Sequence, residues 1–525
     1  MKITLISPSP PDLYAPGVRT LSSYLKKNRH QTKLILLAGG TENLRFGGQF
    51  VYQYRDYVID QVIELSKDTD IVGISFMTQY FDRALQLTKR LKETIKVPIV
   101  WGGIHPTLCP EEGVIHADMV CIGEGEEALL ELMDKMEKGQ DPYNTKNFWF
   151  RRNGGGDIIR NEIRPPITDL DTLPFQDYDF NEHYVYDPIK DSIVALTGRM
   201  FENLFSLAPA LDGRMKPSYK IMTTRGCPMN CTFCASSVLK KKFYSHRYVR
   251  HRSVGNVIKE LEEITTRFPS IKIIQFFDDI LFSLKKDYIK DLCTVYEEKI
   301  GLPFYCQASA TTLDEEKLRY LLDAGLIWVE IGIQSGSDRT NQLYSRKVSN
   351  TQVLKAANLL HKYNHRMLSP CYHVISDNPW ETKEDILKTL SLITDLPRPY
   401  WIKLSSLVLF PKTDLYEKAK AEGLIKNDLE EIYRKPFLHF SGNYLNYLIY
   451  LSGYCYFPRW ILKVLKTPFL VRIFQQKGFD PLFTWLYQIA EVVRKGGRAM
   501  RALLHGDFKR VFHRVQFLLR AKRTG

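Results

Sequence analysis

Three of the nine cysteines stand within eight residues, at Cys227, Cys231 and Cys234, with three and then two residues between them. Thiolates on one short loop can converge on one metal centre, and they are the usual ligands of iron–sulfur clusters. Such clusters usually take four protein ligands, so three would leave one iron open to a cosubstrate. A structural zinc site or unrelated buried cysteines are the alternatives. Zinc would need a fourth ligand, and the nearest histidine, His246, lies twelve residues further on.

The elements that must position this loop alternate between strand and helix from Tyr219 onward. Strands are expected at Tyr219–Thr224, Lys272–Phe277, Pro303–Ala308, Trp328–Ile333, Met367–Ile375 and Trp401–Leu409. Helical periodicity fills the intervals, at Val254–Arg267, Lys285–Lys299, Asp314–Ala324, Thr351–Tyr363 and Lys383–Thr394. Six strands over roughly 190 residues fall short of the ~250 of a closed eight-stranded barrel. We therefore predict a partial (β/α)6 barrel, with its chemistry at the carboxyl ends of the strands.

A second alternation of strands and helices precedes the barrel. Strands are expected at Ile3–Ser7, Lys33–Leu37, Ile71–Ser75, Ile99–Gly102 and Met119–Ile122. Helical stretches such as Phe81–Ile95 separate them. This pattern predicts a doubly wound α/β domain, which binds ligands at the carboxyl ends of its strands.

The length of 525 residues and the hydrophobic content of 44% predict more than one folded domain. We expect a doubly wound domain over residues 1–140, a linker with one hairpin over 141–218, the barrel over 219–424, and a basic, mostly helical extension over 425–525. The start of the chain lacks the features of a signal peptide, so we expect a cytoplasmic protein.

The basic charge is concentrated at the end of the chain. The net charge is +14, and residues 431–525 hold 17 Lys and Arg against 4 Asp and Glu. Trp460–Lys466, Val492–Lys495 and Phe508–Arg520 place apolar residues three or four apart, with basic residues between them. The pattern is typical of helices that lie on anionic membranes. Packing on the barrel and nucleic-acid binding are the alternatives, and the abundance of long apolar residues disfavours nucleic acid.

One short apolar run in the extension could be mistaken for a membrane span. Tyr444–Phe457 has about 14 residues, whereas a bilayer requires about 20. We therefore expect contact with the inner face of a membrane to be peripheral.

The cysteine segment resembles the CxxxCxxC signature of the radical S-adenosylmethionine (radical SAM) superfamily. The resemblance implies a [4Fe-4S] cluster on Cys227, Cys231 and Cys234, with S-adenosylmethionine at the open iron. It also implies an external electron donor and a 5'-deoxyadenosyl radical that abstracts hydrogen from substrate. Phe233 matches the aromatic position that contacts adenine in this family.

Two further barrel segments carry the same resemblance. Phe276–Asp279 resembles the position that binds the amino group of S-adenosylmethionine, which implies roles for Asp278 and Asp279. Glu330–Ser337 resembles the strand that cradles the adenosine, which implies roles for Glu330, Gly332, Gln334 and Ser335. As alternatives, the two aspartates could cap a helix and the glycines, with Gly336, could shape a turn.

The N-terminal domain is similar to the cobalamin-binding domain that precedes many of these barrels. The resemblance rests on Asp70–Thr78, Trp101–Thr107 and Gly123–Glu126. It implies that Ser75, Gly102 and Gly103 contact cobalamin at strand ends, where the backbone can approach a flat cofactor closely. The cobalt-ligating pattern Asp-x-His-x-x-Gly is absent after the first strand. His105 is expected to be a hydrogen-bonded loop histidine rather than a metal ligand.

These resemblances imply a cobalamin-dependent methylation of an inert carbon, with no catalytic residue assigned. The membrane contact expected of the C-terminal extension suggests that the substrate is a hydrophobic, lipid-like small molecule. Cyclisation, oxidation or carbon–carbon coupling without methyl transfer are alternatives, and a zinc-stabilised binding module is the non-enzymatic one. A tRNA methylthiotransferase is disfavoured, because that class has three further cluster cysteines in the N-terminal domain, where this chain has Cys109 and Cys121. Asp377, Asn378 and Lys412 stand where relatives often have glycine.

Overall fold

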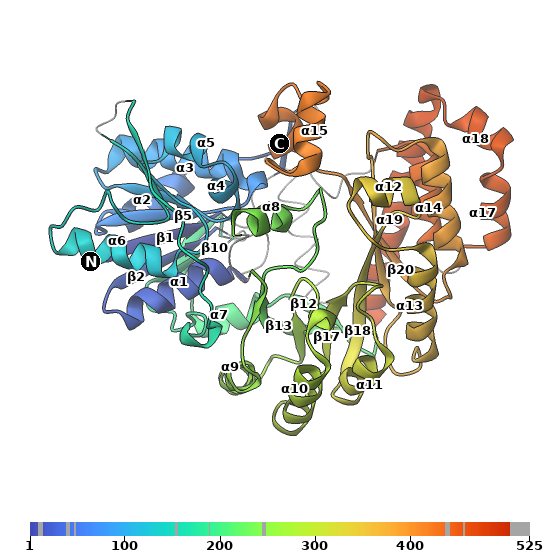
Figure 1. Cartoon of the computed structure of the whole chain (residues 1–525), viewed down its shortest axis with the longest axis horizontal. Helices are drawn as coiled ribbons and strands as arrows, with labels where there is room; N and C mark the ends of the chain where they lie inside the picture. Colours follow the sequence, from blue (N-terminus) through green and yellow to red (C-terminus); the bar gives the residue numbers. More distant parts are fainter. Residues whose placement is uncertain are drawn as a thin grey trace. The chain divides into compact units, whose positions relative to one another are not determined.

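The computed structural model describes residues 1–504 except 9–13, 38–42, 47–48, 153–155, 188–189, 244–247, 436–440 and 455–456 (Figure 1). The chain folds into two units, each assembled from separate segments. The first contains Met1–Ser206, Cys234–Ser253 and Leu409–Lys435, and the second contains Leu207–Phe233, Val254–Val408 and the chain from Pro436 onward.

The first unit is built on a nine-stranded sheet of order β11-β10-β2-β1-β5-β6-β7-β8-β9. Its parallel centre contains β1 (Lys2–Ser7), β2 (Gln31–Leu36), β5 (Ile71–Ser75), β6 (Ile99–Gly102) and β7 (Met119–Cys121). The crossover helices are α1 (Pro16–Lys27), α2 (Asp56–Ser66), α3 (Phe81–Thr94), α4 (Ile104–Leu108), α5 (Pro110–His116) and α6 (Glu126–Glu137). A small hairpin pairs β3 (Asn43–Phe46) with β4 (Gln49–Tyr52). The predicted doubly wound domain is confirmed, with all five of its strands.

The segment 141–218 was expected to be a linker, and this expectation is wrong for most of its length. It supplies β8 (Phe148–Arg151), β9 (Ile158–Arg160), β10 (His183–Asp187) and β11 (Ser192–Ala195) to both edges of the first sheet. Short elements connect them, namely η2 (Leu170–Thr172) and α7 (Gly198–Asn203). Phe148 and Phe150 are buried on the sheet, so these short strands belong to the core of the first unit.

The second unit is built on a seven-stranded sheet of order β12-β13-β16-β17-β18-β19-β20. Its parallel strands are β13 (Met215–Ile221), β16 (Ile273–Phe276), β17 (Phe304–Ala308), β18 (Leu326–Gln334), β19 (Cys371–Ser376) and β20 (Trp401–Ser406). The antiparallel β12 (Leu207–Pro209) flanks β13. The predicted partial barrel of six parallel strands is therefore confirmed.

Helices follow the barrel strands as expected. They are α9 (Val254–Arg267), α10 (Lys286–Lys299), α11 (Glu315–Asp323), α12 (Asp338–Leu343), α13 (Asn350–Lys362) and α14 (Lys383–Asp395). A 3-10 turn, η3 (Leu281–Ser283), precedes α10. Residues alternate along β18, where Val329, Ile331 and Ile333 are buried while Glu330 and Gly332 are partly exposed. This alternation leaves one face of the strand available to line a site.

Two segments predicted to belong to the barrel or the extension belong instead to the first unit. One carries α8 (Ala235–Lys242) and β15 (Arg250–His251); the other carries α15 (Asp414–Ala421) and η4 (Leu429–Tyr433), a π-helical turn. Ion pairs fix both segments: Arg250 Nη2 lies 2.7 Å from Glu124 Oε1, and Arg434 Nε lies 2.8 Å from Asp82 Oδ2. Such pairs between distant residues leave no signal in local periodicity.

The described part of the extension is mostly helical, as expected. It contains α16 (Tyr444–Ser452), α17 (Arg459–Leu465), α18 (Pro468–Phe474), η5 (Lys477–Phe479) and α19 (Asp480–Leu504) (Figure 1). Leu445, Leu448 and Ile449 of α16 are buried, so the apolar run is a core helix. Among the described residues, no helix combines the length and apolar character needed to cross a membrane. The predicted pattern Phe508–Arg520 lies outside the described residues.

Candidate functional site

The cysteine loop leaves the first barrel strand through β14 (Thr224–Arg225). Cys227 is half-buried and Cys231 is buried in the second unit, and Cys234 is the N-cap residue of α8, in a segment of the first unit. The Nη1 atom of Arg346 donates to Cys231 Sγ at 3.7 Å, while its Nη2 donates to the carbonyl of Gly332 at 2.7 Å. Arg346 thus joins the sulfur of the cysteine loop to the backbone of β18.

Asp278 holds the start of the cysteine loop. Its Oδ1 accepts hydrogen bonds from the backbone N–H groups of Thr223 (2.8 Å) and Thr224 (2.6 Å), and also from both threonine hydroxyls. The carboxyl is fully buried, and burial raises its pKa to about 6 despite these four donors. Its second oxygen, Oδ2, has no hydrogen-bond partner among the described residues. A buried, unpaired acceptor is costly, which indicates that an external donor completes this site.

Asp279 and Phe233, which are also predicted to contact S-adenosylmethionine, lie in different environments. Asp279 is exposed after the end of β16, and desolvation by the surrounding protein still raises its pKa. The ring of Phe233 meets Tyr344 edge to face, with centroids 4.9 Å apart. The loop is tethered beside it, because the Thr232 hydroxyl donates to the carbonyl of Leu343 at 2.7 Å. The fully buried Tyr344 thus fixes the position of Phe233.

Glu330 has a protein partner in the fold. Its Oε2 lies 3.0 Å from Nε2 of His373, a residue of the adjacent strand β19. Desolvation would raise the pKa of Glu330, but its hydrogen bond and charge interaction with His373 outweigh burial, so the pKa is lowered. Gly332 contributes its carbonyl to Arg346, and Gln334 adopts a left-handed backbone conformation with φ of 69°. Glu330 is thus part of an acid–imidazole pair on the barrel strands.

Ser335 and Gly336 pack against α14. The Ser335 hydroxyl lies 3.1 Å from Glu381 Oε1 and 3.0 Å from the hydroxyl of Thr389, and the serine is buried. A Cβ on Gly336 would lie 2.7 Å from the Cα of Thr389, so only glycine permits this approach. Close packing against α14 therefore requires glycine at Gly336, and the Ser335 hydroxyl is already engaged within the protein.

Sequence reasoning missed Glu381, Arg346 and the two threonines that contact Asp278. Burial raises the pKa of Glu381 to about 7, although the Ser335 hydroxyl donates to it. The spacing of Arg346 from Cys231, 115 residues, gives no sequence signal. The threonines stand directly before the motif, as Thr223-Thr224-Arg225-Gly226-Cys227, so that two adjacent hydroxyls entering a metal loop could have drawn attention.

The first unit presents a different kind of strand end. Ser75, the last residue of β5, is paired in register with Gly102, the last residue of β6. A Cβ on Gly102 would find its nearest neighbour 4.0 Å away, at Cys121. Gly103 has φ of 95°, and its Cβ would lie 2.8 Å from the backbone of Phe76. Gly102 therefore leaves open space at the sheet edge, whereas Gly103 is required by the fold.

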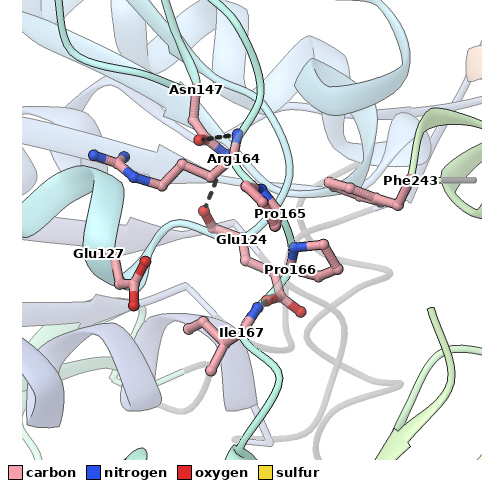
Figure 2. Close-up of a pocket in the computed structure, with 8 residues that line it drawn as sticks. All are labelled: Glu124, Glu127, Asn147, Arg164, Pro165, Pro166, Ile167 and Phe243. Atoms are coloured by element: carbon pink, nitrogen blue, oxygen red, sulfur yellow. Dashed lines mark hydrogen bonds between the residues drawn. The ribbon is translucent and has the colours of Figure 1, made fainter. Parts of the chain in front are cut away.

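The Gly123–Glu126 segment borders a small pocket in the first unit, lined by Glu124, Glu127, Asn147, Arg164, Pro165, Pro166, Ile167 and Phe243 (Figure 2). Glu124 Oε2 accepts from the N–H of Ile167 at 2.8 Å, and the Asn147 side chain accepts from the N–H of Arg164 at 2.9 Å. Together with the Arg250 ion pair, these bonds assign Glu124 a role in holding the unit together.

Two positions where glycine was expected keep the glycine-like backbone. Asp377 has φ of 58° and Lys412 has φ of 63°, both in the left-handed region. Asp377 Oδ1 accepts from Asn446 Nδ2 at 2.8 Å, which holds its side chain in place. Both residues thus hold a backbone conformation that is uncommon for residues other than glycine.

The residues present fit the cofactors implied by the resemblance. Three cysteines in one loop suit a cluster with an open iron, and the unpaired Oδ2 of Asp278 suits an amino group. The open edge at Gly102 suits close approach of a flat cofactor. Burial raises the pKa values of Cys109, Cys121, Cys293 and Cys371 to about 12, so these thiols stay protonated at neutral pH unless a bound metal ion displaces the proton.

Family models match both folded regions. Residues 221–393 match the model of the Radical SAM superfamily, and residues 3–133 match that of the B12 binding domain. These matches imply a [4Fe-4S] cluster, S-adenosylmethionine and cobalamin as cofactors.

Known proteins resemble the chain over most of its length. An uncharacterized methyltransferase from Pyrococcus horikoshii is 28% identical over 365 residues, which cover 68% of this chain and 71% of the relative. Bacteriochlorophyllide d C-8(2)-methyltransferase from Chlorobaculum tepidum is 22% identical over 369 residues, covering 69% and 71%.

Solved structures share the fold. The cobalamin- and [4Fe-4S]-bound radical S-adenosylmethionine methyltransferase TsrM from Kitasatospora setae aligns with a TM-score of 0.58 and 15% identity, covering 80% of this chain and 78% of TsrM. The cobalamin-dependent radical enzyme OxsB aligns with a TM-score of 0.57 and 18% identity, covering 81% of this chain and 55% of OxsB.

The chain is therefore an enzyme in which a region that matches the Radical SAM superfamily follows a B12 binding domain, and it is similar to cobalamin-dependent radical SAM methyltransferases.

Proposed function

We propose that this enzyme methylates an unactivated carbon of a hydrophobic, lipid-like metabolite. When bound, the cluster and S-adenosylmethionine supply a carbon radical for C–H activation, and cobalamin supplies the methyl group. The observation that carries the proposal is the cysteine loop anchored on Asp278, whose Oδ2 lacks a partner among the described residues, in a chain that also has an open glycine edge at Gly102.

Different residues of the chain would bind different cofactors. Cys227, Cys231 and Cys234 would hold the cluster, with Arg346 beside Cys231. Asp278 and Asp279 would bind the amino group of S-adenosylmethionine, and Phe233 would contact its adenine. Ser75, Gly102 and Gly103 would face cobalamin. The barrel would exclude water and hold the C–H bond near the radical.

Products of S-adenosylmethionine test the reaction without a known substrate. Full-length protein, reconstituted without oxygen with iron, sulfide and cobalamin, should form both 5'-deoxyadenosine and S-adenosylhomocysteine when reduced. Methyl transfer yields the second product, whereas cyclisation or oxidation yields only the first. Formation of 5'-deoxyadenosine alone, with cobalamin bound, would replace the methyltransferase proposal with the alternatives.

The C-terminal helices support a hydrophobic substrate and a membrane surface. Trp460, Val464 and Phe469 of α17 and α18 are 69%, 52% and 71% exposed, and Trp485, Val492 and Val493 of α19 are 57%, 70% and 69% exposed. Exposed Lys463, Arg472 and Lys477 lie in the same segment. Apolar side chains beside cations match an anionic bilayer surface. Docking there would bring the enzyme to a lipid-like substrate.

Vesicle flotation tests this contact. The protein should float with vesicles that contain anionic lipid and should float less with neutral ones. A Trp460→Ser, Phe469→Ser variant should lose most of the binding, whereas Ile115→Ser, which removes an exposed apolar residue of the first unit, should retain it. Equal flotation of all three proteins would refute the membrane contact.

A further inference from the structure

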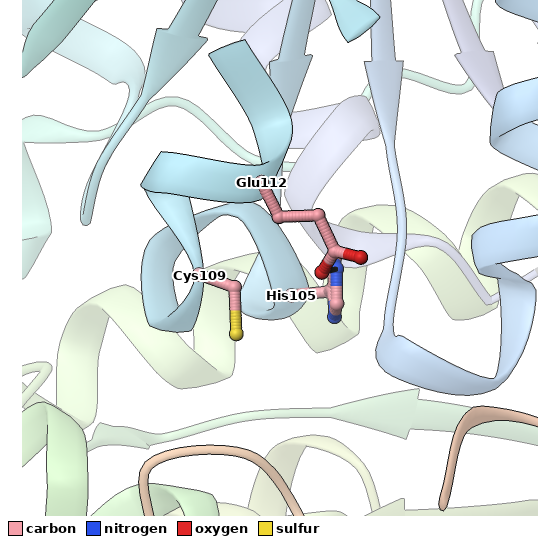
Figure 3. Close-up of side chains that lie close together, drawn as sticks. All are labelled: His105, Cys109 and Glu112. Atoms are coloured by element: carbon pink, nitrogen blue, oxygen red, sulfur yellow. Dashed lines mark ion pairs between the residues drawn. The ribbon is translucent and has the colours of Figure 1, made fainter. Parts of the chain in front are cut away.

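A group of potential metal ligands lies in the first unit, on the turn that follows β6. His105 is on α4, Cys109 joins α4 to α5, and Glu112 is in the first turn of α5 (Figure 3). One ligand atom from each residue lies within 4.8 Å of the others. His105 and Cys109 are buried, and the Glu112 side chain is 32% exposed. This spacing places nitrogen, sulfur and oxygen ligands around one point.

The imidazole of His105 is oriented as a metal ligand would be. Its Nδ1 lies 3.2 Å from the hydroxyl of Thr78, which fixes the ring. Its Nε2 lies 3.2 Å from Glu112 Oε2 but makes no hydrogen bond there, and it has no hydrogen-bond partner among the described residues. A fully buried ring nitrogen left unpaired is costly, and ligating histidines typically use their other nitrogen in this way.

The carboxylate of Glu112 is also held in place. The Tyr433 hydroxyl donates to its Oε2 at 2.7 Å, and the Tyr433 ring meets His105 edge to face with centroids 5.0 Å apart. In the part of the chain that the structure describes, no lysine or arginine forms an ion pair with Glu112. The carboxylate charge is therefore available to a cation.

Two of the three other groups of similar composition are already satisfied by the protein, and the third, Glu330, Cys371 and His373, lies on the barrel strands of the second unit. Asp177 accepts from Ser22 and pairs with Lys26 and His183. In the group around His30, Glu137 binds the N-terminal ammonium at 2.7 Å. Cations of the chain thus occupy those carboxylates, which distinguishes them from Glu112.

We propose that His105, Cys109 and Glu112 bind one divalent transition-metal ion of the zinc type. Imidazole, thiolate and carboxylate are the ligands that zinc takes, and three of them leave a fourth position for water. The ion would provide the partner that His105 Nε2 lacks, and it would displace the thiol proton of Cys109. It would also fasten the turn that begins at Gly103. This site is separate from the cluster cysteines and does not depend on the proposed reaction.

Metal analysis of the full-length protein tests the proposal. The chain should retain about one zinc ion after exposure to excess Zn²⁺ and dialysis, in addition to any iron. Cys109→Ser and His105→Gln should each lower zinc at least about tenfold. Cys121→Ser, which changes another buried thiol of the first unit, should retain it. A variant with Cys227, Cys231 and Cys234 all changed to alanine should also retain it.

Two readouts keep the result independent of folding defects. A thiol-binding mercurial added to the unmodified chain should release one zinc ion. In the variant without the cluster cysteines, Co²⁺ should give a thiolate charge-transfer band that Cys109→Ser abolishes. The proposal is overturned if the unmodified chain retains no zinc, or if zinc is lost with the cluster cysteines but survives Cys109→Ser.

Discussion

The strand ends of the two units differ in what they offer a ligand. In the second unit, the end of β16 presents Asp278 and Asp279, and a guanidinium lies beside Cys231. In the first unit, β5 ends in Ser75 and β6 ends in Gly102, where a Cβ would have its nearest neighbour 4.0 Å away. The barrel is equipped to bind a charged, polar cosubstrate through side chains. The first sheet is equipped to admit a large flat group by leaving side chains out.

This difference predicts how each site responds to mutation. A site made of side chains should lose function when a polar atom is removed. A site made of open space should lose function when an atom is added. The following substitutions test this contrast.

The largest effect is expected from removing a cluster ligand. Cys231→Ala should lower retained iron and 5'-deoxyadenosine formation at least ~100-fold, because a cluster with two protein ligands is poorly held. Iron analysis and product assay after anaerobic reconstitution measure both. Cys293→Ser, a buried thiol on α10, serves as control and should keep both signals. Equal loss of iron and of 5'-deoxyadenosine in Cys293→Ser would contradict the assignment of the cluster to the cysteine loop.

Asp278→Ala should destabilise the second unit by about 3 kcal/mol, because it leaves the N–H and hydroxyl donors of two threonines unsatisfied. Asp278→Asn keeps an acceptor for them but offers an amide to an incoming ammonium group. We expect Asn to preserve most of the stability and still weaken S-adenosylmethionine binding. Denaturant unfolding and equilibrium binding separate the two effects, and unchanged affinity in the Asn variant would remove Asp278 from the cosubstrate site.

Two adjacent glycines of the first unit should respond in opposite ways. Gly103→Ala should destabilise it by about 2 kcal/mol, since the residue has φ of 95° and no room beside Phe76. Gly102→Ala should leave stability nearly unchanged and weaken cobalamin binding, because its new methyl group would enter the open edge. Thermal unfolding and a cobalamin titration provide the measurements. If cobalamin binds Gly102→Ala normally, the open edge is not its site.

The last expected effect is seen only when the pH changes, and it comes from a carboxyl in the second unit. The pKa of Glu381 is about 7 in the fold, above its ordinary 4.5, mainly because of burial. Its contribution to stability is therefore complete below about pH 4.5 and is lost as pH rises through 7. Glu381→Gln removes this loss. As the pH rises from 5 to 8.5, the unfolding free energy of the variant should therefore increase by about 1–3 kcal/mol relative to that of the wild type. If the difference in unfolding free energy between the variant and the wild type is the same at both pH values, the raised pKa of Glu381 is contradicted.

The sequence anticipated the elements better than their assembly. Strands and helices such as α9, Val254–Arg267, follow the 2.0 and 3.6 periods of buried residues, so their limits could be predicted. The membership of 234–253 and 409–435 in the first unit depends on ion pairs such as that of Arg434 with Asp82, 352 residues apart. The left-handed backbone of Asp377 likewise follows from tertiary contacts, since nothing in its type requires it.

The candidate site shows the same difference between local motifs, which the sequence predicts, and long-range contacts, which it does not. Local spacing predicted the cluster cysteines, and resemblance to the family predicted roles for the aspartates after β16. The network that holds them is nonlocal, because Arg346 lies between α12 and α13, 115 residues from Cys231, and Thr224 lies 54 residues from Asp278. The hydroxyl of Ser335 forms hydrogen bonds with Glu381 and Thr389, and the motif alone did not predict these contacts.

The most direct test of a cluster with one open iron is electron paramagnetic resonance of the reduced protein. Adding S-adenosylmethionine to the reconstituted, reduced enzyme should shift the g-values of the cluster signal, because the cosubstrate binds the iron that the three cysteines leave free. The Asp278→Asn variant should require more S-adenosylmethionine for the same shift. A cluster signal that S-adenosylmethionine leaves unchanged at saturating concentration would contradict the account.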